Sequence, residues 1–140
     1  MTKKMLVVED EKIDVLRISQ ALSQDFPDVE LEVVGNGEQA LDWVHRFNPA
    51  ENQRPLLIFM DLTIPRMSGL DLISEFKKNA HLRNAPIVIL SAHDSQRAIQ
   101  SAYSSGASGY VVKPDSSAEM QKVVKKTLEY WLTANRLPEP

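Results

Sequence analysis

The chain has 140 residues, the size of one domain, and its 43% hydrophobic and 25% charged residues are typical of a globular protein. It contains no cysteine, which excludes disulfides, thiolate metal sites and a cysteine nucleophile. A net charge of −3 argues against a nucleic-acid-binding domain. No apolar run approaches the ~18 residues of a membrane span, so we expect a cytoplasmic protein without a membrane segment.

Five short apolar runs alternate along the chain with five segments of helical periodicity. Strands are predicted at 4–8, 29–34, 56–60, 87–91 and 109–112. The helices that follow them are predicted at 13–23, 38–47, 70–79, 95–105 and 118–132. We expect one domain over residues 1–140, with a core at about 4–132 and a tail at 133–140.

The composition of the strands indicates how they are arranged. Runs 4–8, 56–60 and 87–91 are apolar almost throughout, which is typical of parallel strands covered by helices on both faces. Run 29–34 alternates between apolar and acidic residues, which suits an edge strand. The alternation of strands and helices predicts an α/β fold, a (βα)5 doubly wound, flavodoxin-like parallel sheet in the order 2-1-3-4-5.

Local signals predict where the helices begin and which face they bury. The predicted N-terminal caps of the last four helices are Asn36, Ser68 with Asp71, Asp94, and Ser116 with Glu119. In the first helix, Ile13, Leu16 and Ala21 with Leu22 have the spacing of a buried face.

Polar side chains stand at the ends of four predicted strands. Glu9 and Asp10 follow the first strand, Asp61 follows the third, Ser91 ends the fourth and Lys113 follows the fifth. Ligands of doubly wound sheets bind at the carboxyl ends of the strands, where strand order reverses, so we expect these side chains to meet. Carboxylates about 4 Å apart repel each other by about 4 kcal/mol at an effective dielectric constant of about 20, so the cluster needs positive charge.

Two cations can supply that charge, the ammonium of Lys113 and a hard divalent ion. An all-oxygen site with a main-chain carbonyl suits Mg²⁺ and disfavours zinc, and we predict Asp10, Asp61 and the carbonyl of Thr63 as ligands. Beside Mg²⁺, the Asp61 carboxylate can attack a phosphoryl group to form an acyl phosphate, while Lys113 and Ser91 donate to the phosphoryl oxygens. No Gly-rich phosphate loop is present, so the sequence does not indicate nucleotide binding.

Four motifs in this order resemble those of the receiver domains of two-component response regulators, the fold shared with chemotaxis response regulators. They are LVVEDE (6–11), MDLTIPRMSGLDLI (60–73), PIVILSA (86–92) and SGYVVKP (108–114). The resemblance covers about residues 4–132 and implies a phosphoacceptor that assists its own phosphorylation without being a turnover enzyme. It also implies a sensor histidine kinase as phosphoryl donor, Mg²⁺ as cofactor, and a downstream protein partner.

The resemblance implies roles for individual residues. Asp61 corresponds to the phosphoacceptor, Lys113 to the lysine that pairs with the phosphoryl group, and Ser91 to the hydroxyl that follows it. Tyr110 corresponds to the aromatic residue that moves on activation, so Ser91 and Tyr110 form the implied switch. The implied metal ligands are Glu9, Asp10, Asp61 and the backbone carbonyl of Thr63.

Two further segments make the resemblance specific to one group within the family. EYWLTANRLP (129–138), together with HLRNAPIVILS (81–91), is similar to the single-domain regulators paired with cyanobacterial phytochromes and related histidine kinases. This implies a regulator without an output domain, which signals to another protein. Self-association through the fourth helix, fifth strand and fifth helix is an expected output.

Departures from the family pattern leave the phosphoryl lifetime open. Glu9 replaces the commoner Asp and reaches farther, which often leaves its metal contact to water. Thr63 and His93 occupy the two positions that tune phosphoryl lifetime in the family, and neither predicts a rate.

Three other classes of function stay open. The first is a Mg²⁺-dependent phosphatase, disfavoured because Thr63 is no acid, and the second is a flavin-binding module, disfavoured by the acidic first loop. The third is a phosphorylation-independent interaction module.

Overall fold

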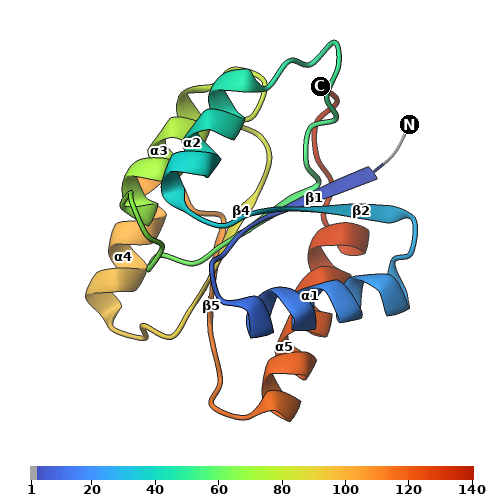
Figure 1. The fold of residues 1–140 in the computed structure, drawn as a ribbon, viewed down its shortest axis with the longest axis vertical. Coiled ribbons are helices and arrows are strands. Elements are labelled where there is room, and N and C mark those ends of the chain that lie inside the picture. The colour runs from blue at the N-terminus through green and yellow to red at the C-terminus, as the bar shows by residue number, and fades with distance from the viewer. Residues whose placement is uncertain (1–2) are drawn as a thin grey trace.

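The computed structural model describes residues 3–140, which form a five-stranded parallel sheet between two layers of helices (Figure 1). The strands are β1 (Lys3–Val8), β2 (Val29–Val34), β3 (Leu57–Met60), β4 (Ile87–Ser91) and β5 (Gly109–Val112). The helices are α1 (Lys12–Asp25), α2 (Gly37–Arg46), α3 (Gly69–Lys78), α4 (Gln96–Ser105) and α5 (Ser117–Glu129), followed by the π-helical turn η1 (Tyr130–Ala134). The order β2-β1-β3-β4-β5 confirms the predicted topology.

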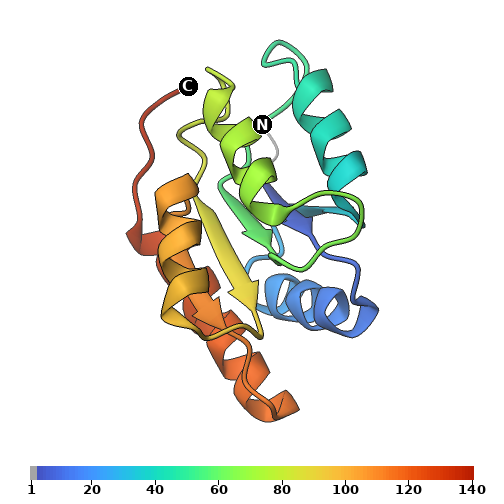
Figure 2. The ribbon, with the colours of Figure 1, turned by 90° about the vertical axis from the view of Figure 1, so that its left-hand side faces the viewer.

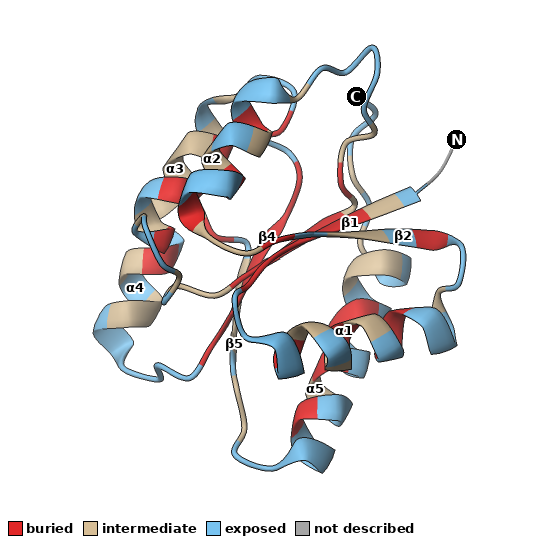
Figure 3. Ribbon diagram, viewed as in Figure 1, coloured by how far each residue is buried: buried red, intermediate tan, exposed pale blue. Residues whose placement is uncertain are grey.

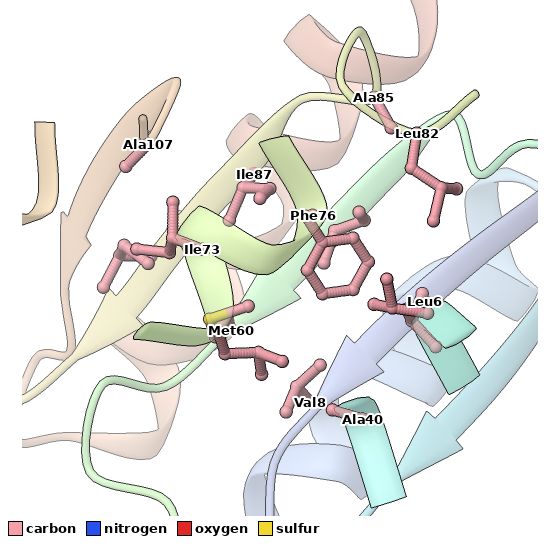
Figure 4. Close-up of a cluster of buried hydrophobic side chains, with 14 of the residues drawn as sticks. Leu6, Val8, Ala40, Met60, Ile73, Phe76, Leu82, Ala85, Ile87 and Ala107 are labelled. Carbon is pink, nitrogen blue, oxygen red and sulfur yellow. The ribbon is translucent and has the colours of Figure 1, made fainter. Parts of the chain in front are cut away.

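The two faces of the sheet carry separate apolar cores. In Figures 1 and 2, α2, α3 and α4 cover one face, and α1 and α5 cover the other. On the first face Phe76 of α3 lies at the centre of a cluster with Leu6 of β1 and Ile87 of β4 (Figure 4). On the second face Ile18 of α1 and Val124 of α5 pack against the other side of the same strands. Both cores use the sheet, which explains why its central strands are apolar at most positions.

Burial follows the strand pattern predicted from the sequence. The central strands β1, β3 and β4 are buried over most of their length, whereas each helix is buried on one side only (Figure 3). In β2, Glu30 is exposed and Val29 and Val34 are buried, in agreement with its position at the edge of the sheet.

Parallel register brings the carboxyl ends of the strands to one edge. Val8 of β1 is paired with Val34 of β2 and with Met60 of β3, and Ser91 of β4 is paired with Val112 of β5. The residue that follows each strand therefore emerges at the same edge of the sheet. This is the edge at which the candidate site lies.

The observed helix caps differ from the predicted ones at two places. Asn36 accepts a hydrogen bond from the Gln39 N–H, and Ser116 accepts one from the Glu119 N–H, as predicted. Ser68 precedes α3 but its side chain makes no capping hydrogen bond. The cap of α4 is Ser95, not Asp94, because the Ser95 hydroxyl accepts from the Ala98 N–H. The prediction of Asp94 was wrong by one residue.

The predicted last helix changes its hydrogen-bond pattern before it ends. α5 stops at Glu129 and η1 follows, with the Asn135 N–H donating to the Tyr130 carbonyl at 2.9 Å. The Thr133 hydroxyl donates to the Glu129 carbonyl at this junction. Beyond η1 the chain returns toward the end of the sheet at which the strands begin. There Arg54, which precedes β3, donates to the Pro138 carbonyl at 2.7 Å. Within residues 3–140 no helix is long and apolar enough to cross a membrane.

Candidate functional site

The site is built by backbone hydrogen bonds that continue the sheet just past its strands. The Glu9 N–H donates to the Val34 carbonyl, the Asp61 N–H to the Val8 carbonyl, and the Lys113 N–H to the Ser91 carbonyl, at 3.1, 3.1 and 2.8 Å. Each of the three charged residues is thus held to a neighbouring strand. The sheet, and not a flexible loop, positions the functional side chains.

Lys113 is the centre of the cluster. Its Nζ donates to Glu9 Oε1 at 2.8 Å, to Asp14 Oδ2 at 2.7 Å and to Asp61 Oδ2 at 2.7 Å. Burial lowers the pKa of the Lys113 ammonium, but the hydrogen bonds from Asp14, Asp61 and Glu9 outweigh burial and leave this pKa raised. Lys113 is therefore a permanent cation at neutral pH, and it holds together residues from the ends of two strands, β1 and β3, and from α1.

Glu9 shows that the cluster has too little positive charge. Its side chain is only 4% exposed, and its Oε2 accepts from the Asp10 and Glu11 N–H groups at 3.1 and 3.4 Å. The pKa of the Glu9 carboxyl is raised from 4.5 to about 7, mainly by burial; the Lys113 hydrogen bond opposes this effect and the Asp61 charge adds to it. Three carboxylates share one ammonium, so additional positive charge would be stabilising here.

Asp14 is a member of the cluster that our sequence analysis missed. It lies in the first turn of α1, and its side chain is buried against the strand ends. Its other oxygen, Oδ1, lies 3.7 Å from the Arg17 guanidinium. Asp14, Ile18 and Ala21 have the i, i+4, i+7 spacing of one helix face, so the sequence allowed this face to be buried but did not select it over the face of Ile13 and Leu16.

The buried face of α1 corrects our prediction. Asp14, Ile18, Ala21 and Leu22 are buried, whereas Ile13 and Leu16 are each 56% exposed. The spacing of Ile13 and Leu16 with Ala21 was thus read as the wrong face of the helix. The buried face of α1 begins with the Asp14 carboxylate in the first turn. At that position the side chain points toward the ammonium of Lys113 instead of the apolar core.

The second carboxylate oxygen of Asp61 faces the β3–α3 loop. Asp61 Oδ1 accepts from the Thr63 N–H at 2.9 Å, and the Thr63 hydroxyl lies 2.9 Å from Nε2 of His93. This contact joins the loop after β3 to the loop after β4. The two positions that the family resemblance associates with phosphoryl lifetime are therefore in direct contact beside Asp61.

Ser91 and Tyr110 meet at the same β4–α4 loop. Ser91 is fully buried and its Oγ accepts from the His93 N–H at 3.2 Å. The Tyr110 hydroxyl donates to the His93 carbonyl at 2.6 Å. The two residues of the implied switch are thus linked through the backbone of His93.

Asp10 differs from the other acidic residues of the site. It is exposed, and among the described residues its carboxylate forms no ion pair. Within residues 3–140, no three His, Cys, Asp or Glu side chains together form a metal site, so a cation here would have fewer than three such ligands. The donors nevertheless fit a hard divalent cation that keeps several waters, because Asp10 and Asp61 supply carboxylate oxygens next to a surplus of negative charge. Glu9, whose two oxygens already accept hydrogen bonds, would reach such a cation through water.

Two hollows on the surface lie away from this cluster. One of about 510 Å³ lies beside α2 and is lined by Trp43 and Phe47, and one of about 480 Å³ lies against the tail and is lined by Arg54 and His81. Neither hollow includes a residue of the Lys113 cluster. The candidate chemistry thus belongs to the largely buried charged cluster at the strand ends and to neither hollow.

Comparison with known proteins gives consistent matches over almost the whole chain. A family model described as the response regulator receiver domain matches residues 5–125. The response regulator Rcp1 of Synechocystis sp. is 28% identical over 137 residues, which cover 97% of this chain and 93% of Rcp1. The probable methanogenesis regulatory protein FilR2 of Methanothrix harundinacea is 29% identical over 136 residues, which cover 97% of this chain and 88% of FilR2.

Solved structures agree with these matches. The crystal structure of the phosphorylated cyanobacterial phytochrome response regulator RcpA has a TM-score of 0.90 at 29% identity, covering 99% of this chain and 100% of RcpA. The Mn²⁺-bound form of Rcp1 has a TM-score of 0.88 at 27% identity, covering 98% of this chain and 99% of Rcp1.

Proposed function

Because the chain belongs to the response regulator receiver domain family, we propose that Asp61 accepts a phosphoryl group from the phosphohistidine of a sensor histidine kinase. The observation that carries this proposal is the pair of donors on Asp61, with Lys113 Nζ on Oδ2 and the Thr63 N–H on Oδ1. They hold the carboxylate at the end of β3 with its charge partly neutralised. The acceptor is therefore preorganised before the phosphoryl group arrives.

The transfer exchanges one bond for another. An oxygen of Asp61 forms a bond to phosphorus, the bond from phosphorus to the imidazole nitrogen of the kinase breaks, and that nitrogen keeps the electron pair and takes up a proton. Lys113 stabilises negative charge on the phosphoryl oxygens, and the Ser91 hydroxyl donates to one of them in the phosphorylated protein. The donor is the kinase and the product stays on Asp61, so the protein assists its own phosphorylation and is not a turnover enzyme.

The proposed cofactor is Mg²⁺, held by Asp10, Asp61 and the backbone carbonyl of Thr63, with Glu9 contributing through water. A bound divalent cation would offset charge on the phosphoryl oxygens. Support comes from the surplus of negative charge around Lys113 and from the Mn²⁺-bound form of Rcp1. Exposed Asp10 leaves its carboxylate available for this role.

The proposed switch consists of Ser91 and Tyr110. For Ser91 to follow the phosphoryl group, the loop that carries His93 must move, because the Ser91 hydroxyl is bonded to the His93 N–H. The same movement breaks or redirects the bond between Tyr110 and the His93 carbonyl. Phosphorylation would thereby change the surface around α4 and β5 and bias the protein toward a second conformation.

The proposed partners follow from this surface and from the relatives. RcpA is described as a phytochrome response regulator, which supports a phytochrome-like kinase as the phosphoryl donor. A downstream protein, or a second copy of the chain, would bind the face of α4, β5 and α5, where Tyr103 and Val112 are exposed apolar residues. We also propose that residues 1–140 form one receiver domain that works in the cytoplasm.

The direct test is phosphorylation with acetyl phosphate, followed by intact mass. We expect one added phosphoryl group in the presence of Mg²⁺ and none without it. Asp61→Asn should abolish the addition, whereas Asp71→Asn, the same change at an exposed position in α3, should leave it intact. Repeated hydrolysis of a phosphate ester by the wild type would instead support the phosphatase alternative, and phosphorylation of Asp61→Asn would contradict the proposed acceptor.

A further inference from the structure

Lys113 has no free donor with which to bind a phosphoryl group. A lysine ammonium has three N–H donors. In this structure Glu9, Asp14 and Asp61 each lie within 2.8 Å of Nζ, so each donor has a carboxylate partner. If Lys113 is to pair with a phosphoryl group on Asp61, it must give up or share one of these partners.

We propose that Asp14 is a positioning residue that holds Lys113 in the unphosphorylated protein and releases it when Asp61 carries a phosphoryl group. This inference rests on the proposed function, because it concerns the same lysine and the same acceptor. It adds a residue of α1 to the set that decides how readily the phosphorylated form is reached. Asp14 thereby competes with the phosphoryl group for Lys113.

Asp14 is a better candidate for release than Glu9. Glu9 emerges directly from β1, and its second oxygen has only the backbone N–H groups of its own loop. Asp14 lies on a helix, and its second oxygen has a cationic neighbour, the Arg17 guanidinium at 3.7 Å. Loss of Lys113 would leave Glu9 without a charged partner, whereas Asp14 could move fully to Arg17. A buried carboxylate without a cation is the costlier outcome.

Release of Asp14 would be transmitted to α5. Arg17 Nη2 now donates to the Ser117 hydroxyl at 2.5 Å, and Ser117 is the first residue of α5. A closer ion pair between Arg17 and Asp14 would weaken this bond between α1 and α5. The side of the protein formed by these two helices would then respond to phosphorylation, in addition to the face formed by α4 and β5.

The first test measures the affinity for beryllofluoride, a tetrahedral analogue of the phosphoryl group, at saturating Mg²⁺. Asp14→Asn keeps the shape but replaces the ion pair by a weaker hydrogen bond from the ammonium to a neutral amide oxygen, so Lys113 is released more easily. We expect the dissociation constant for beryllofluoride to fall about tenfold. Asp25→Asn, the same change at the exposed end of α1, should leave it unchanged. An unchanged or larger dissociation constant in Asp14→Asn would overturn the proposal.

The second test separates competition for Lys113 from a general change in charge. Arg17→Gln removes the alternative partner of Asp14, so release becomes costlier and beryllofluoride should bind a few-fold more weakly. In the Asp14→Asn background, Arg17→Gln should have little effect, because no carboxylate then needs the guanidinium. Equal effects of Arg17→Gln in both backgrounds would indicate simple electrostatics and overturn the inference. If Asp14→Asn fails to fold, Arg17→Gln together with Arg17→Lys, which should restore the affinity, tests the same step.

The two proposals fail in distinguishable ways. A wild-type protein that takes up neither acetyl phosphate nor beryllofluoride would overturn the proposed function and this inference with it. A wild type that is phosphorylated on Asp61, with Asp14→Asn indistinguishable from it in beryllofluoride affinity, would overturn only the role of Asp14.

Discussion

At position 113 a single ammonium compensates three carboxylates from separate parts of the chain. Mutation of this one lysine therefore affects all three carboxylates at once. Glu9 and Asp61 come from strand ends and Asp14 from α1, and among residues 3–140 the side chain to which all three are bonded is that of Lys113. Removal of a partner from a buried ion pair costs more than the pair contributes, because the remaining charges stay buried without compensation.

We therefore expect Lys113→Ala to lower the free energy of unfolding of the metal-free protein by about 3 kcal/mol, as measured by urea denaturation. The loss should shrink when Mg²⁺ is added, because the cation supplies the missing positive charge. The variant should still accept a phosphoryl group, more slowly, but without the change in partner affinity. Lys122→Ala, at an exposed lysine of α5, serves as the control. A variant that responds to phosphorylation as the wild type does would show that Lys113 is not part of the switch.

The raised pKa of Glu9 makes the stability of the protein depend on pH. Its pKa is raised from 4.5 to about 7 in the folded protein, mainly by burial, so folding favours the protonated form. The stabilising contribution is fully present below about pH 4.5 and is lost as pH rises through about 7. In the metal-free protein, urea denaturation should show stability falling as pH rises from 4.5 to about 7, between the unfolded and the folded pKa of Glu9. Glu9→Gln should remove this part of the slope, and an unchanged slope in the variant would assign it to another group.

At the scale of elements, α1 shows how a helix can match its predicted range and still present a different face. The predicted segment 13–23 lies within the observed helix, but its inward side carries Asp14 and Ile18 instead of Ile13 and Leu16. Both pairs satisfy helical spacing. Packing against α5 and the second face of the sheet selects one of them, and the sequence of α1 by itself does not contain that information.

The rotation of α1 gives a direct test with two matched substitutions. Ile18 is 1% exposed and packs in the core, so Ile18→Ala should lower the free energy of unfolding by about 2–5 kcal/mol. Leu16→Ala should change it by no more than about 0.5 kcal/mol, because Leu16 is exposed. Urea denaturation of both variants checks the prediction. Equal losses would contradict the observed orientation of α1.

At the scale of the whole molecule, the two helical layers leave the face of α4 and β5 with apolar residues that have no cover within the described residues. Tyr103 on α4 is 49% exposed and Val112 on β5 is 39% exposed. Both lie on the surface that the proposed switch changes through Ser91, Tyr110 and the loop of His93. Exposed apolar residues next to a switch are typical of an interaction surface.

If this face mediates self-association, Tyr103→Ser should weaken the dimer of the phosphorylated protein. Analytical ultracentrifugation with beryllofluoride and Mg²⁺ would measure the monomer–dimer equilibrium. We expect a shift toward monomer of tenfold or more in the dissociation constant, which is the usual effect of removing an aromatic residue that anchors an interface. Leu16→Ser, at an exposed apolar residue on the other side of the molecule, should have no effect. Dimerisation of Tyr103→Ser like that of the wild type would place the interface elsewhere.

The sequence by itself determined the alternation of strands and helices, the order of the sheet, the family, and the residues that follow each strand. These features depend on local pattern: apolar runs define buried strands, and parallel register then brings Glu9, Asp61 and Lys113 to one edge. Only the tertiary structure decided that Asp14 joins them, that Arg17 links Asp14 to Ser117, and that Thr63 contacts His93. The physical reason is that strand ends are aligned by backbone hydrogen bonds, whereas the rotation of a helix and the contacts between loops depend on side chains distant in the sequence.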